Sequence, residues 1–256
     1  MSNPKEPHFF AKDEVYARGW DWYASLFEEA GDAKAIGDGT TGYTLHTVFP
    51  LAPARIARDL PGAKLIYMVR DPLERIESAW MQRRGDGVPT WRLGKTLRRY
   101  PRMVDASRYW KQLSYYRRYF PDEQILILFF EEFKQSPEDV LRACFEFLEV
   151  DTGVHGEQSH RVENASWGKL GESAFSVWAR HNPKMRQLGQ LFPKSLRQTV
   201  RSIGRRKLTQ RPEWDAATLE WVLYEIAADA AEFLHFAGKP GDYWDLGLHR
   251  GNRTNI

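Results

Sequence analysis

Residues Lys64–Trp80 combine three signals that together leave few possible folds. Leu65–Val69 is an uninterrupted run of apolar and aromatic residues, which is typical of a strand covered on both faces of a parallel sheet. Arg70 follows the run, and Asp71 and Pro72 then provide an N-cap and a first helical residue. In open α/β sheets ligands bind beyond the carboxyl ends of strands. Arg70 is therefore placed where a guanidinium can bind a phosphate.

Two further apolar runs, Ala33–Ile36 and Ile125–Phe130, predict strands of the same sheet. Helical patterns alternate with the runs, which indicates an α/β fold with a parallel sheet between layers of helices. The predicted helices are Tyr16–Glu29, Pro50–Asp59, Pro72–Gln82, Ser107–Tyr119, a helix capped by Ser136, and Ala216–Phe236, which Gly238 is expected to end. No strand is predicted after Val150. The part from about residue 150 is therefore expected to be helical and to belong to a single domain spanning residues 1–256.

The composition suits a folded domain and argues against several kinds of site. Hydrophobic residues make up 42% of the chain, which is enough for a core. The single cysteine, Cys144, excludes an intramolecular disulfide and a cysteine-based metal cluster, and no metal site is predicted. No apolar run of about 18 residues is present, so no transmembrane segment is predicted. Residues 1–10 lack the apolar region of a signal peptide, and a cytoplasmic protein is expected.

Positive charge is concentrated in two stretches, although the net charge is only +3. Arg83–Arg118 contains eleven Lys or Arg residues and two acids, and Arg180–Arg211 contains ten with no acid. Such stretches attract anionic partners, and a nucleotide, a sugar chain or a nucleic acid would each fit. A solvated basic surface explains the same pattern, so no specific nucleic-acid binding is predicted.

The pattern Arg70-x-Pro72, with Ser78 eight residues after the arginine, resembles the 3′-phosphate motif of sulfotransferases that use the nucleotide sulfate donor PAPS. The heparan-sulfate-type and related bacterial branch is the most similar. The resemblance implies a three-layer α/β/α fold like that of P-loop nucleotide-binding proteins, with Arg70 and Ser78 holding the 3′-phosphate. From the residues alone, a helix-capping arginine followed by an ordinary helical serine is an equal alternative.

Two N-terminal segments agree with this resemblance. Lys5–Phe10, reading KEPHFF, is similar to the family's Lys-Glu-x-His-Phe-Phe segment. This similarity implies that Glu6 is the general base for an acceptor hydroxyl and that His8 assists or orients it. Without the resemblance, Glu6 would be interpreted as a solvated loop carboxylate. Ile36–Tyr43 is similar to the family's Gly-Glu-Lys-Ser/Thr-Pro-x-Tyr loop, but Gly39 stands where many relatives have lysine.

The resemblance extends over most of the chain. Ile125–Val150 resembles the family's strand, acidic pair and helix started by Ser and Pro, and Asn164–Ser166 resembles a short family loop. Arg205 and Lys207 stand near where relatives bring a basic loop to the 3′-phosphate. The candidate residues for binding the acceptor, a small molecule or a carbohydrate, are Lys5, Gly39 and Trp91. The acceptor itself and the oligomeric state are not indicated by the sequence.

One part of the family's donor site is not found in this sequence. Relatives have a first strand followed by a loop similar to Lys-x-Gly-Thr-Ser/Thr, whose N–H groups and lysine hold the 5′-phosphosulfate. No such loop precedes Lys5, so the first strand is expected to be missing. Met1 is interpreted as an internal methionine of a longer protein, and a short chain that binds the nucleotide weakly is the other explanation.

Three functions are open at this point. The preferred one is transfer of a sulfuryl group from PAPS to a hydroxyl or amine, without a metal ion, with Glu6 as base and Arg70 and Ser78 as donor ligands. The second is a non-catalytic module that binds nucleotides or polyanions, which the basic stretches motivate. The third is a P-loop kinase, which shares the strand–turn–helix architecture but needs a phosphate loop and a magnesium carboxylate.

Overall fold

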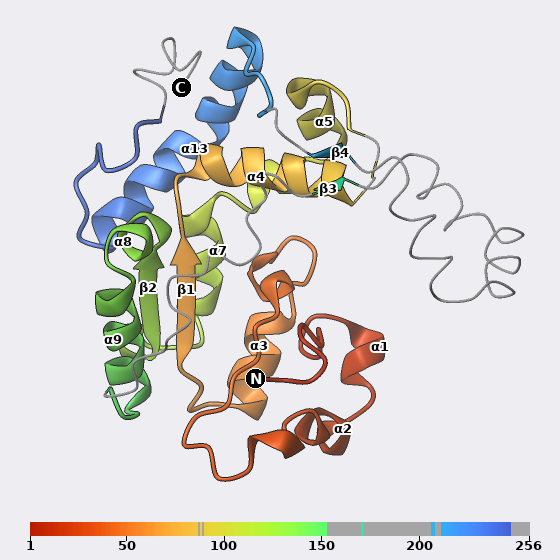
Figure 1. The fold of residues 1–256 in the computed structure, drawn as a ribbon, viewed down its shortest axis with the longest axis vertical. Helices are drawn as coiled ribbons and strands as arrows, with labels where there is room; N and C mark the ends of the chain where they lie inside the picture. Colours follow the sequence, from red (N-terminus) through yellow and green to blue (C-terminus); the bar gives the residue numbers. More distant parts are fainter. Residues whose placement is uncertain (87, 89, 153–169, 172–205, 208–210, 247–256) are drawn as a thin grey trace, which may run out of the picture. The chain divides into compact units, whose positions relative to one another are not determined.

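The computed structural model describes residues 1–86, 88, 90–152, 170–171, 206–207 and 211–246 (Figure 1). Its main sheet consists of two parallel strands, β1 (Leu65–Val69) and β2 (Ile125–Phe129), which pair along their whole length. The prediction of both strands is confirmed, and β2 ends one residue earlier than predicted. A parallel pair needs a crossover connection, and the helices between the two strands supply it.

The environment of β1 differs from the prediction. The side chains of Ile66 and Met68 are 43% and 44% exposed, whereas Val69 is buried. The continuous apolar run therefore identified the strand, but among the described residues one face of β1 is not covered.

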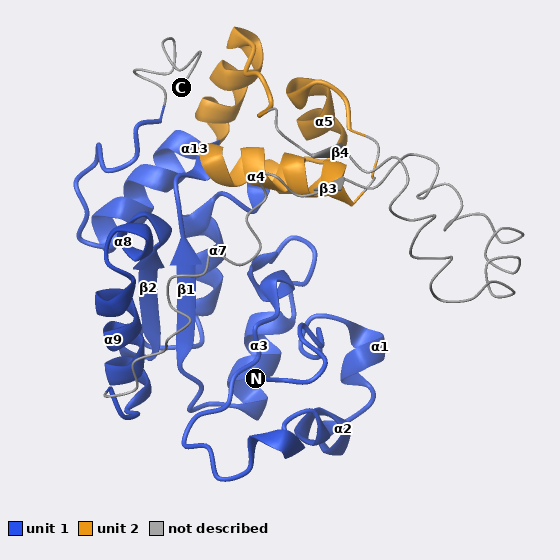
Figure 2. Cartoon of the chain, viewed as in Figure 1, with its two compact units in different colours: residues 1–72, 105–161, 226–256 blue, residues 73–104, 162–225 orange. Residues whose placement is uncertain are grey.

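The chain divides into two compact units (Figure 2). Unit 1 contains Met1–Pro72, Asp105–Arg161 and Ile226–Ile256, and therefore both strands of the main sheet. Unit 2 contains Leu73–Val104 and Val162–Glu225. This division does not test the expected single domain, which stays a prediction.

The N-terminal part of unit 1 consists of short helices and differs from the prediction in two places. Its elements are α1 (Asp13–Tyr16), α2 (Trp20–Ser25), the 3-10 helices η1 (Glu28–Ala30) and η2 (Thr41–Thr44), and α3 (Ala52–Asp59). The single helix predicted at Tyr16–Glu29 is wrong, because Gly19 has a φ of 83° and separates α1 from α2. The strand predicted at Ala33–Ile36 is also wrong. These residues are exposed and join no ladder in the described part of the chain, and an unpaired strand leaves its backbone groups unsatisfied.

The remaining elements of unit 1 follow the sheet strands or cover them. They are α7 (Tyr109–Tyr116), η3 (Asp122–Gln124), α8 (Phe130–Gln135), α9 (Pro137–Leu148) and the C-terminal half of α13 (Ala216–Phe236). The predicted bounds of α13 are confirmed, and Gly238 ends the helix with a φ of 66°. The N–H groups of Gly238 and Lys239 donate to carbonyls of the last helical turn. Ser136 is the N-cap residue of α9 but makes no side-chain cap hydrogen bond, contrary to the prediction.

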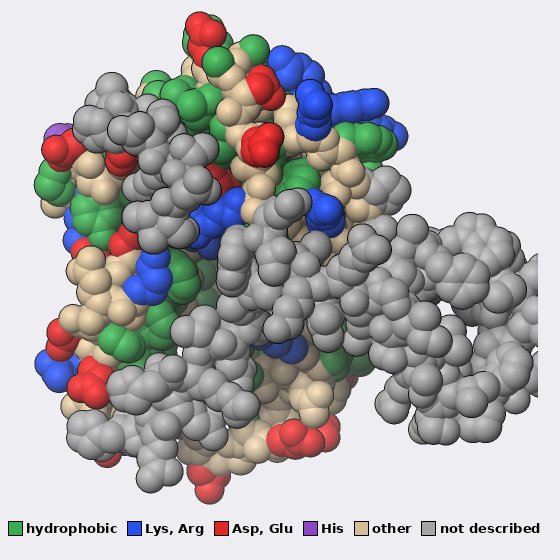
Figure 3. Space-filling model, turned by 45° about the horizontal axis from the view of Figure 1, so that its top comes forward, with side chains coloured by type: hydrophobic (Ala, Val, Ile, Leu, Met, Phe, Trp, Pro, Cys, Tyr) green, Lys and Arg blue, Asp and Glu red, His purple; other side chains and the backbone are tan. Residues whose placement is uncertain are grey.

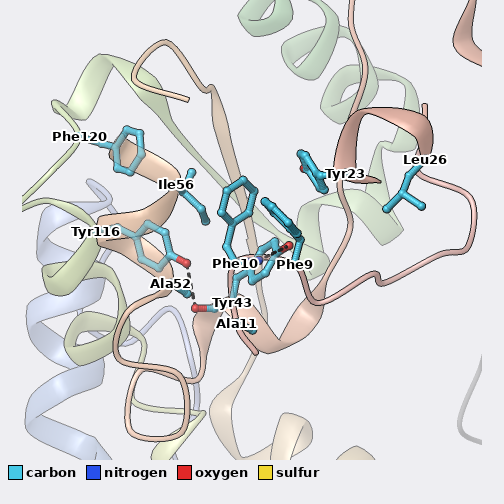
Figure 4. Close-up of a cluster of buried hydrophobic side chains, with 10 residues drawn as sticks. All are labelled: Phe9, Phe10, Ala11, Tyr23, Leu26, Tyr43, Ala52, Ile56, Tyr116 and Phe120. Atoms are coloured by element: carbon cyan, nitrogen blue, oxygen red, sulfur yellow. Dashed lines mark hydrogen bonds between the residues drawn. The ribbon is translucent and has the colours of Figure 1, made fainter. Parts of the chain in front are cut away.

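Two groups of buried side chains stabilise unit 1. The first group, drawn in Figure 4, consists of Phe9, Phe10, Ala11, Tyr23, Leu26, Tyr43, Ala52, Ile56, Tyr116 and Phe120. The second group lies against the sheet and consists of Val69, Tyr109, Leu113, Phe129, Ala230, Phe233, Leu234 and Trp244. Helix α7 contributes residues to both groups, so it connects the N-terminal segment to the sheet.

The described residues of unit 2 form mainly helices. The described elements are α4 (Pro72–Gly85) after the first residue, α5 (Leu93–Arg99), most of α6 (Arg102–Asp105), the N-terminal half of α13, and the short strands β3 (Leu170–Gly171) and β4 (Arg206–Lys207). The antiparallel pair β3–β4 corrects the expectation that no strand follows Val150. Gly94 and Thr218 are in close contact, because a Cβ at Gly94 would lie 2.1 Å from the Thr218 hydroxyl. Of the helices that the structure describes, none is long and apolar enough to cross a membrane.

Candidate functional site

The Glu6–His8 segment has an irregular backbone conformation. Glu6 and His8 both have a φ of 57°, a left-handed conformation that costs a residue with a side chain about 1–2 kcal/mol. The carbonyl of His8 accepts hydrogen bonds from the N–H groups of the next turn, which closes the segment. Phe9 and Phe10 follow it and are each only 1% exposed. The buried phenylalanines therefore anchor a segment whose polar side chains stay near the surface.

The side chains of Glu6 and His8 lie close to each other. Glu6 Oε2 is 4.0 Å from His8 Nε2 and accepts a hydrogen bond from Thr41 Oγ1 at 3.3 Å. The Glu6 side chain is 36% exposed and that of His8 is 29% exposed, so both remain accessible to a bound molecule. A carboxylate beside an imidazole can accept a proton from a hydroxyl group. The two residues predicted as catalytic are thus brought together, and their role stays a prediction.

His8 fits its position because Gly42 has no side chain. A Cβ at Gly42 would lie 3.2 Å from His8 Nδ1 and 3.3 Å from a ring carbon of Phe49, closer than ordinary van der Waals contact. His8 Nδ1 is buried and makes no hydrogen bond within the described residues. The position of the imidazole therefore depends on this close packing.

Asp38 connects the glycine-rich loop to the backbone of His8, and sequence reasoning missed it. Asp38 Oδ1 accepts hydrogen bonds from the N–H and hydroxyl of Thr40 at 3.0 and 2.7 Å. Asp38 Oδ2 accepts from the hydroxyls of Tyr43 and Tyr23 at 2.5 and 3.3 Å. The Thr40 hydroxyl oxygen in turn accepts the His8 N–H at 3.3 Å. The Asp38 carboxylate therefore fixes the loop that supports the Glu6–His8 segment.

The hydroxyls of Tyr23 and Tyr43 stay protonated and donate hydrogen bonds to Asp38. Burial, together with the charge of Asp38 and its hydrogen bonds, raises the pKa of both Tyr23 and Tyr43 well above the usual tyrosine value. Both hydroxyls therefore stay protonated at ordinary pH. An aspartate two residues before a threonine in a glycine-rich loop is a local turn pattern, and it was the signal that could have identified Asp38.

The candidate acceptor residues of the N-terminal region occupy accessible positions. Gly39 lies in the Asp38 loop, where a Cβ would be 3.0 Å from the terminal methyl of Met1. Lys5 is exposed, one residue before Glu6. An acceptor-binding role for Lys5 and Gly39 stays a prediction.

Trp91 lies in unit 2, just before α5. The residue is 39% exposed, and its carbonyl accepts hydrogen bonds from Trp80 Nε1 and Thr96 Oγ1, both at 3.1 Å. The segment that follows Trp91 is folded, because Leu93 and Leu97 of α5 are buried. The backbone of Trp91 has a structural role, and its ring is accessible to a ligand.

Arg70 lies at the carboxyl end of β1, as predicted. It is half-buried, and its carbonyl accepts a hydrogen bond from the Tyr109 hydroxyl at 2.8 Å. Ser78 is half-buried in α4 and belongs to unit 2, whereas Arg70 belongs to unit 1. Joint binding of one phosphate by Arg70 and Ser78 stays a prediction.

The predicted basic loop is described only in part. Lys207 belongs to β4, where it is paired with Leu170 of β3. Arg205 and the segment Asn164–Ser166 lie outside the described residues. The predicted contact of Arg205 and Lys207 with the donor stays a prediction.

The basic stretch Arg83–Arg118 spans parts of both units, and several of its cations contact residues of the unit in which they lie. Rings or carboxylates lie against four of its cations in the pairs Arg83–Tyr100, Arg98–Trp221, Lys111–Asp105 and Arg117–Asp122. On the face drawn in Figure 3, several Lys and Arg side chains of the described residues gather at the upper right, whereas several Asp and Glu side chains lie along the bottom. Several cations of the stretch already have partners, so the stretch alone does not indicate a polyanion-binding surface.

A cavity of about 410 Å³ lies beside the first buried group. Its lining residues are Phe9, Tyr16, Gly19, Trp20, Arg58 and Asp59. None of the predicted site residues lines it, so this cavity does not coincide with the Glu6–His8 pair.

Comparisons with known proteins indicate the family of this chain. Residues 6–153 match the profile of a family described as the sulfotransferase family. Human heparan sulfate glucosamine 3-O-sulfotransferase 3B1 is 33% identical over 153 residues, which cover 56% of this chain and 38% of the relative. Human heparan sulfate glucosamine 3-O-sulfotransferase 6 is 32% identical over 172 residues, which cover 64% of this chain and 48% of the relative. The chain thus matches less than half the length of either relative.

A solved structure shares the fold. The crystal structure of a sulfotransferase from Alicyclobacillus acidocaldarius superposes with a TM-score of 0.65, covering 95% of this chain and 87% of the other, at 20% identity. This likeness confirms the predicted α/β sulfotransferase fold. The family match covers more than half of the chain and includes Glu6, His8, Arg70 and Ser78. This protein belongs to the sulfotransferase family.

Proposed function

We propose that this protein transfers a sulfuryl group from PAPS to a hydroxyl or amine group of an acceptor. The observation that carries the proposal is the accessible Glu6–His8 pair, with 4.0 Å between Glu6 Oε2 and His8 Nε2, in a chain of the sulfotransferase family. Glu6 accepts the proton of the acceptor group as the acceptor atom forms its bond to sulfur. The bond from sulfur to the bridging phosphate oxygen breaks, and its electron pair leaves with the desulfated product, PAP. His8 orients the carboxylate from beside it.

Arg70 is proposed to hold the 3′-phosphate of the donor. Its position at the carboxyl end of β1 is where α/β sheets bind ligands, and a guanidinium can bind phosphate through two parallel hydrogen bonds. Ser78, Arg205 and Lys207 are proposed as further ligands of the same phosphate. No metal ion is required in this proposal.

The proposed acceptor is a carbohydrate. Two relatives are named as heparan sulfate glucosamine 3-O-sulfotransferases, which supports this proposal. The accessible side chain of Trp91 supports it as well. An exposed tryptophan ring can stack on a sugar ring, and Lys5 can bind a sulfate or carboxylate of an anionic sugar. Placement of the protein in the cytoplasm stays a prediction from the sequence.

The test is a sulfuryl-transfer assay with PAPS and a panel of carbohydrate acceptors that includes heparan sulfate, using protein from the complete reading frame. The Glu6→Gln variant is expected to lose about 10²–10⁴-fold in turnover, because proton transfer by a general base contributes that much. Its affinity for PAP, measured by calorimetry, is expected to be unchanged. Full turnover in Glu6→Gln would contradict the role of Glu6.

A matched control is Glu14→Gln, because Glu14 is an exposed glutamate of α1 in the same unit. This variant is expected to keep the wild-type rate. A complete absence of PAP binding by the wild-type protein would instead favour a different function. Neither a kinase nor a polyanion-binding module is favoured by a specific observation in the described residues.

A further inference from the structure

The peptide group that joins Arg70 to Asp71 is held from both sides by side chains. Its carbonyl oxygen, on Arg70, accepts a hydrogen bond from the Tyr109 hydroxyl at 2.8 Å. Its N–H, on Asp71, donates to Glu131 Oε1 at 2.7 Å. Two residues distant in sequence therefore fix the orientation of one peptide plane.

This peptide group lies beyond the hydrogen-bond ladder of the described sheet. The β1–β2 register ends at Val69 opposite Phe129, and α4 begins at Pro72. Half-buried backbone groups outside a ladder need other partners, because an unpaired one is costly. Tyr109 and Glu131 supply such partners at the point where the strand turns into the helix.

The two side chains are held in different ways. Tyr109 begins α7 and is 2% exposed, and the centroid of its ring lies 6.0, 5.5 and 5.5 Å from those of Tyr67, Phe233 and Trp244. Glu131 is half-buried in the first turn of α8, directly after β2, and its Oε2 atom is buried. Tyr109 cannot move far without opening the core, and the short α8 that carries Glu131 directly follows the end of β2.

The orientation of this peptide influences the direction in which the Arg70 side chain leaves the strand. A guanidinium binds a phosphate through two parallel hydrogen bonds only within a narrow range of orientations. We propose that Tyr109 and Glu131 are positioning residues that hold Arg70 in the orientation that binds the 3′-phosphate of the donor. This inference rests on the proposed function, since it takes Arg70 as the ligand of that phosphate.

The test is calorimetric titration of the full-length protein with PAP. Tyr109→Phe removes one hydrogen bond and is expected to weaken PAP binding about 3- to 10-fold. Glu131→Ala removes a carboxylate acceptor and is expected to weaken it about 10-fold or more. Glu131→Gln keeps an acceptor oxygen and is expected to stay within about 3-fold of the wild type. In an Arg70→Ala background, Tyr109→Phe is expected to cause no further loss.

The matched control is Tyr116→Phe. Tyr116 lies on the same helix, is buried, and donates to the Tyr43 carbonyl at 2.8 Å. The Tyr116→Phe variant thus loses an equivalent hydrogen bond away from β1, and its affinity for PAP is expected to equal that of the wild type. Circular dichroism of each variant distinguishes weak binding from failure to fold. If Tyr109→Phe does not fold, the PAP affinities of Glu131→Gln and Glu131→Ala are compared instead.

The outcomes are distinguishable. Binding by the wild type that is lost in Arg70→Ala but unchanged in Tyr109→Phe and Glu131→Ala would overturn this inference alone. Equal losses in Tyr109→Phe and Tyr116→Phe would also overturn it, because the effect would then be general. No PAP binding by the wild type would overturn the proposed function and this inference together.

Discussion

The Glu6–His8 segment and the end of β1 are both positioned by hydrogen bonds, but the bonds come from different kinds of structure. The segment has a left-handed backbone at Glu6 and His8 and depends on one aspartate in a loop. The end of β1 follows a regular ladder, and a buried tyrosine of α7 and a half-buried glutamate of α8 hold the peptide group beyond it. For its side-chain hydrogen bonds the first region therefore relies mainly on one carboxylate, and the second distributes the same task over a sheet and two helices.

This difference has a consequence for how each region responds to substitution. A carboxylate that accepts four hydrogen bonds leaves several buried donors unpaired when it is removed. At the end of β1, the loss of the hydrogen bond from Tyr109 or to Glu131 leaves the hydrogen bonds of the β1–β2 ladder in place. We call the Glu6–His8 segment with the Asp38 loop the loop-built region, and the end of β1 with the residues of α7 and α8 that bind it the sheet-built region. We expect substitutions to lower the free energy of unfolding more in the loop-built region, and the following experiments test that ranking.

The largest effect is expected from Asp38→Ala. The hydroxyls of Tyr23 and Tyr43 are buried and would lose their acceptor, so the free energy of unfolding should fall by about 2–4 kcal/mol. Urea denaturation measures this loss. Asp21→Ala, at an exposed aspartate of α2, is the control and should change stability by less than about 0.5 kcal/mol. Equal stability of the two variants would contradict the central role of Asp38.

A smaller loss is expected from Gly42→Ala. The new methyl group would lie 3.2 Å from His8 Nδ1, so overpacking should cost about 1–3 kcal/mol and displace the imidazole. Turnover should fall while PAP affinity is retained, which calorimetry and the transfer assay measure in parallel. Gly62→Ala is the control, because a Cβ there meets nothing within 4 Å. Unchanged turnover in Gly42→Ala would show that His8 needs no exact placement.

Asp229→Ala tests the sheet-built region. Asp229 Oδ1 and Oδ2 accept the N–H groups of Trp110 and Lys111 at 3.0 and 2.7 Å, so this residue of α13 caps the start of α7. Loss of such a cap should cost about 1–2 kcal/mol in a chemical denaturation experiment. Asp242→Ala, at an exposed aspartate, should have no comparable effect. A loss greater than that of Asp38→Ala would reverse the ranking of the two regions.

The smallest effect is a pH dependence at Asp105. Burial alone would raise the pKa of Asp105, but hydrogen bonds from Lys111 and Thr47 and nearby positive charges hold it below the usual aspartate value. A depressed pKa in the folded state means that this stabilisation is complete above the unfolded pKa near 4 and is lost as the pH falls through the folded pKa.

The expected contribution of Asp105 is about 1 kcal/mol, as for a typical intramolecular hydrogen bond. Urea denaturation at pH 7 and pH 3 measures it as the difference between the wild type and Asp105→Asn. The two proteins should differ at pH 7, and the difference should shrink as the pH falls to 3. A difference that is the same at both pH values would refute the assignment to Asp105.

The sequence predicted the sheet-built region better than the loop-built one. β1 was predicted with its bounds, because an apolar run between Lys64 and Arg70 has few other interpretations. The bounds of α13 also followed from local signals, including Gly238. Both elements are determined by short-range patterns of burial and backbone preference, which a single sequence contains.

The loop-built region could not be predicted in the same way. The pattern of apolar residues continues through Gly19, so periodicity alone predicts one helix where the structure has α1 and α2 on either side of Gly19. Asp38 was missed because the fold, and not spacing along a helix or strand, brings Tyr23 to it and brings the His8 N–H to its neighbour Thr40. Glu6 and His8 were identified only through the family resemblance, because a lone glutamate in a loop has no distinctive pattern.

The length of helix α7 sets the distance between the two regions. Its first residue, Tyr109, binds the end of β1, and its last, Tyr116, binds the carbonyl of Tyr43 beside the Glu6–His8 segment. Seven residues of helix span about 10 Å and nearly two whole turns, so the two hydroxyls leave the same side of the helix. One residue inserted between them would rotate one tyrosine by about 100° relative to the other. The length of this helix is therefore a fixed dimension of the molecule, and only insertions outside it preserve both attachments.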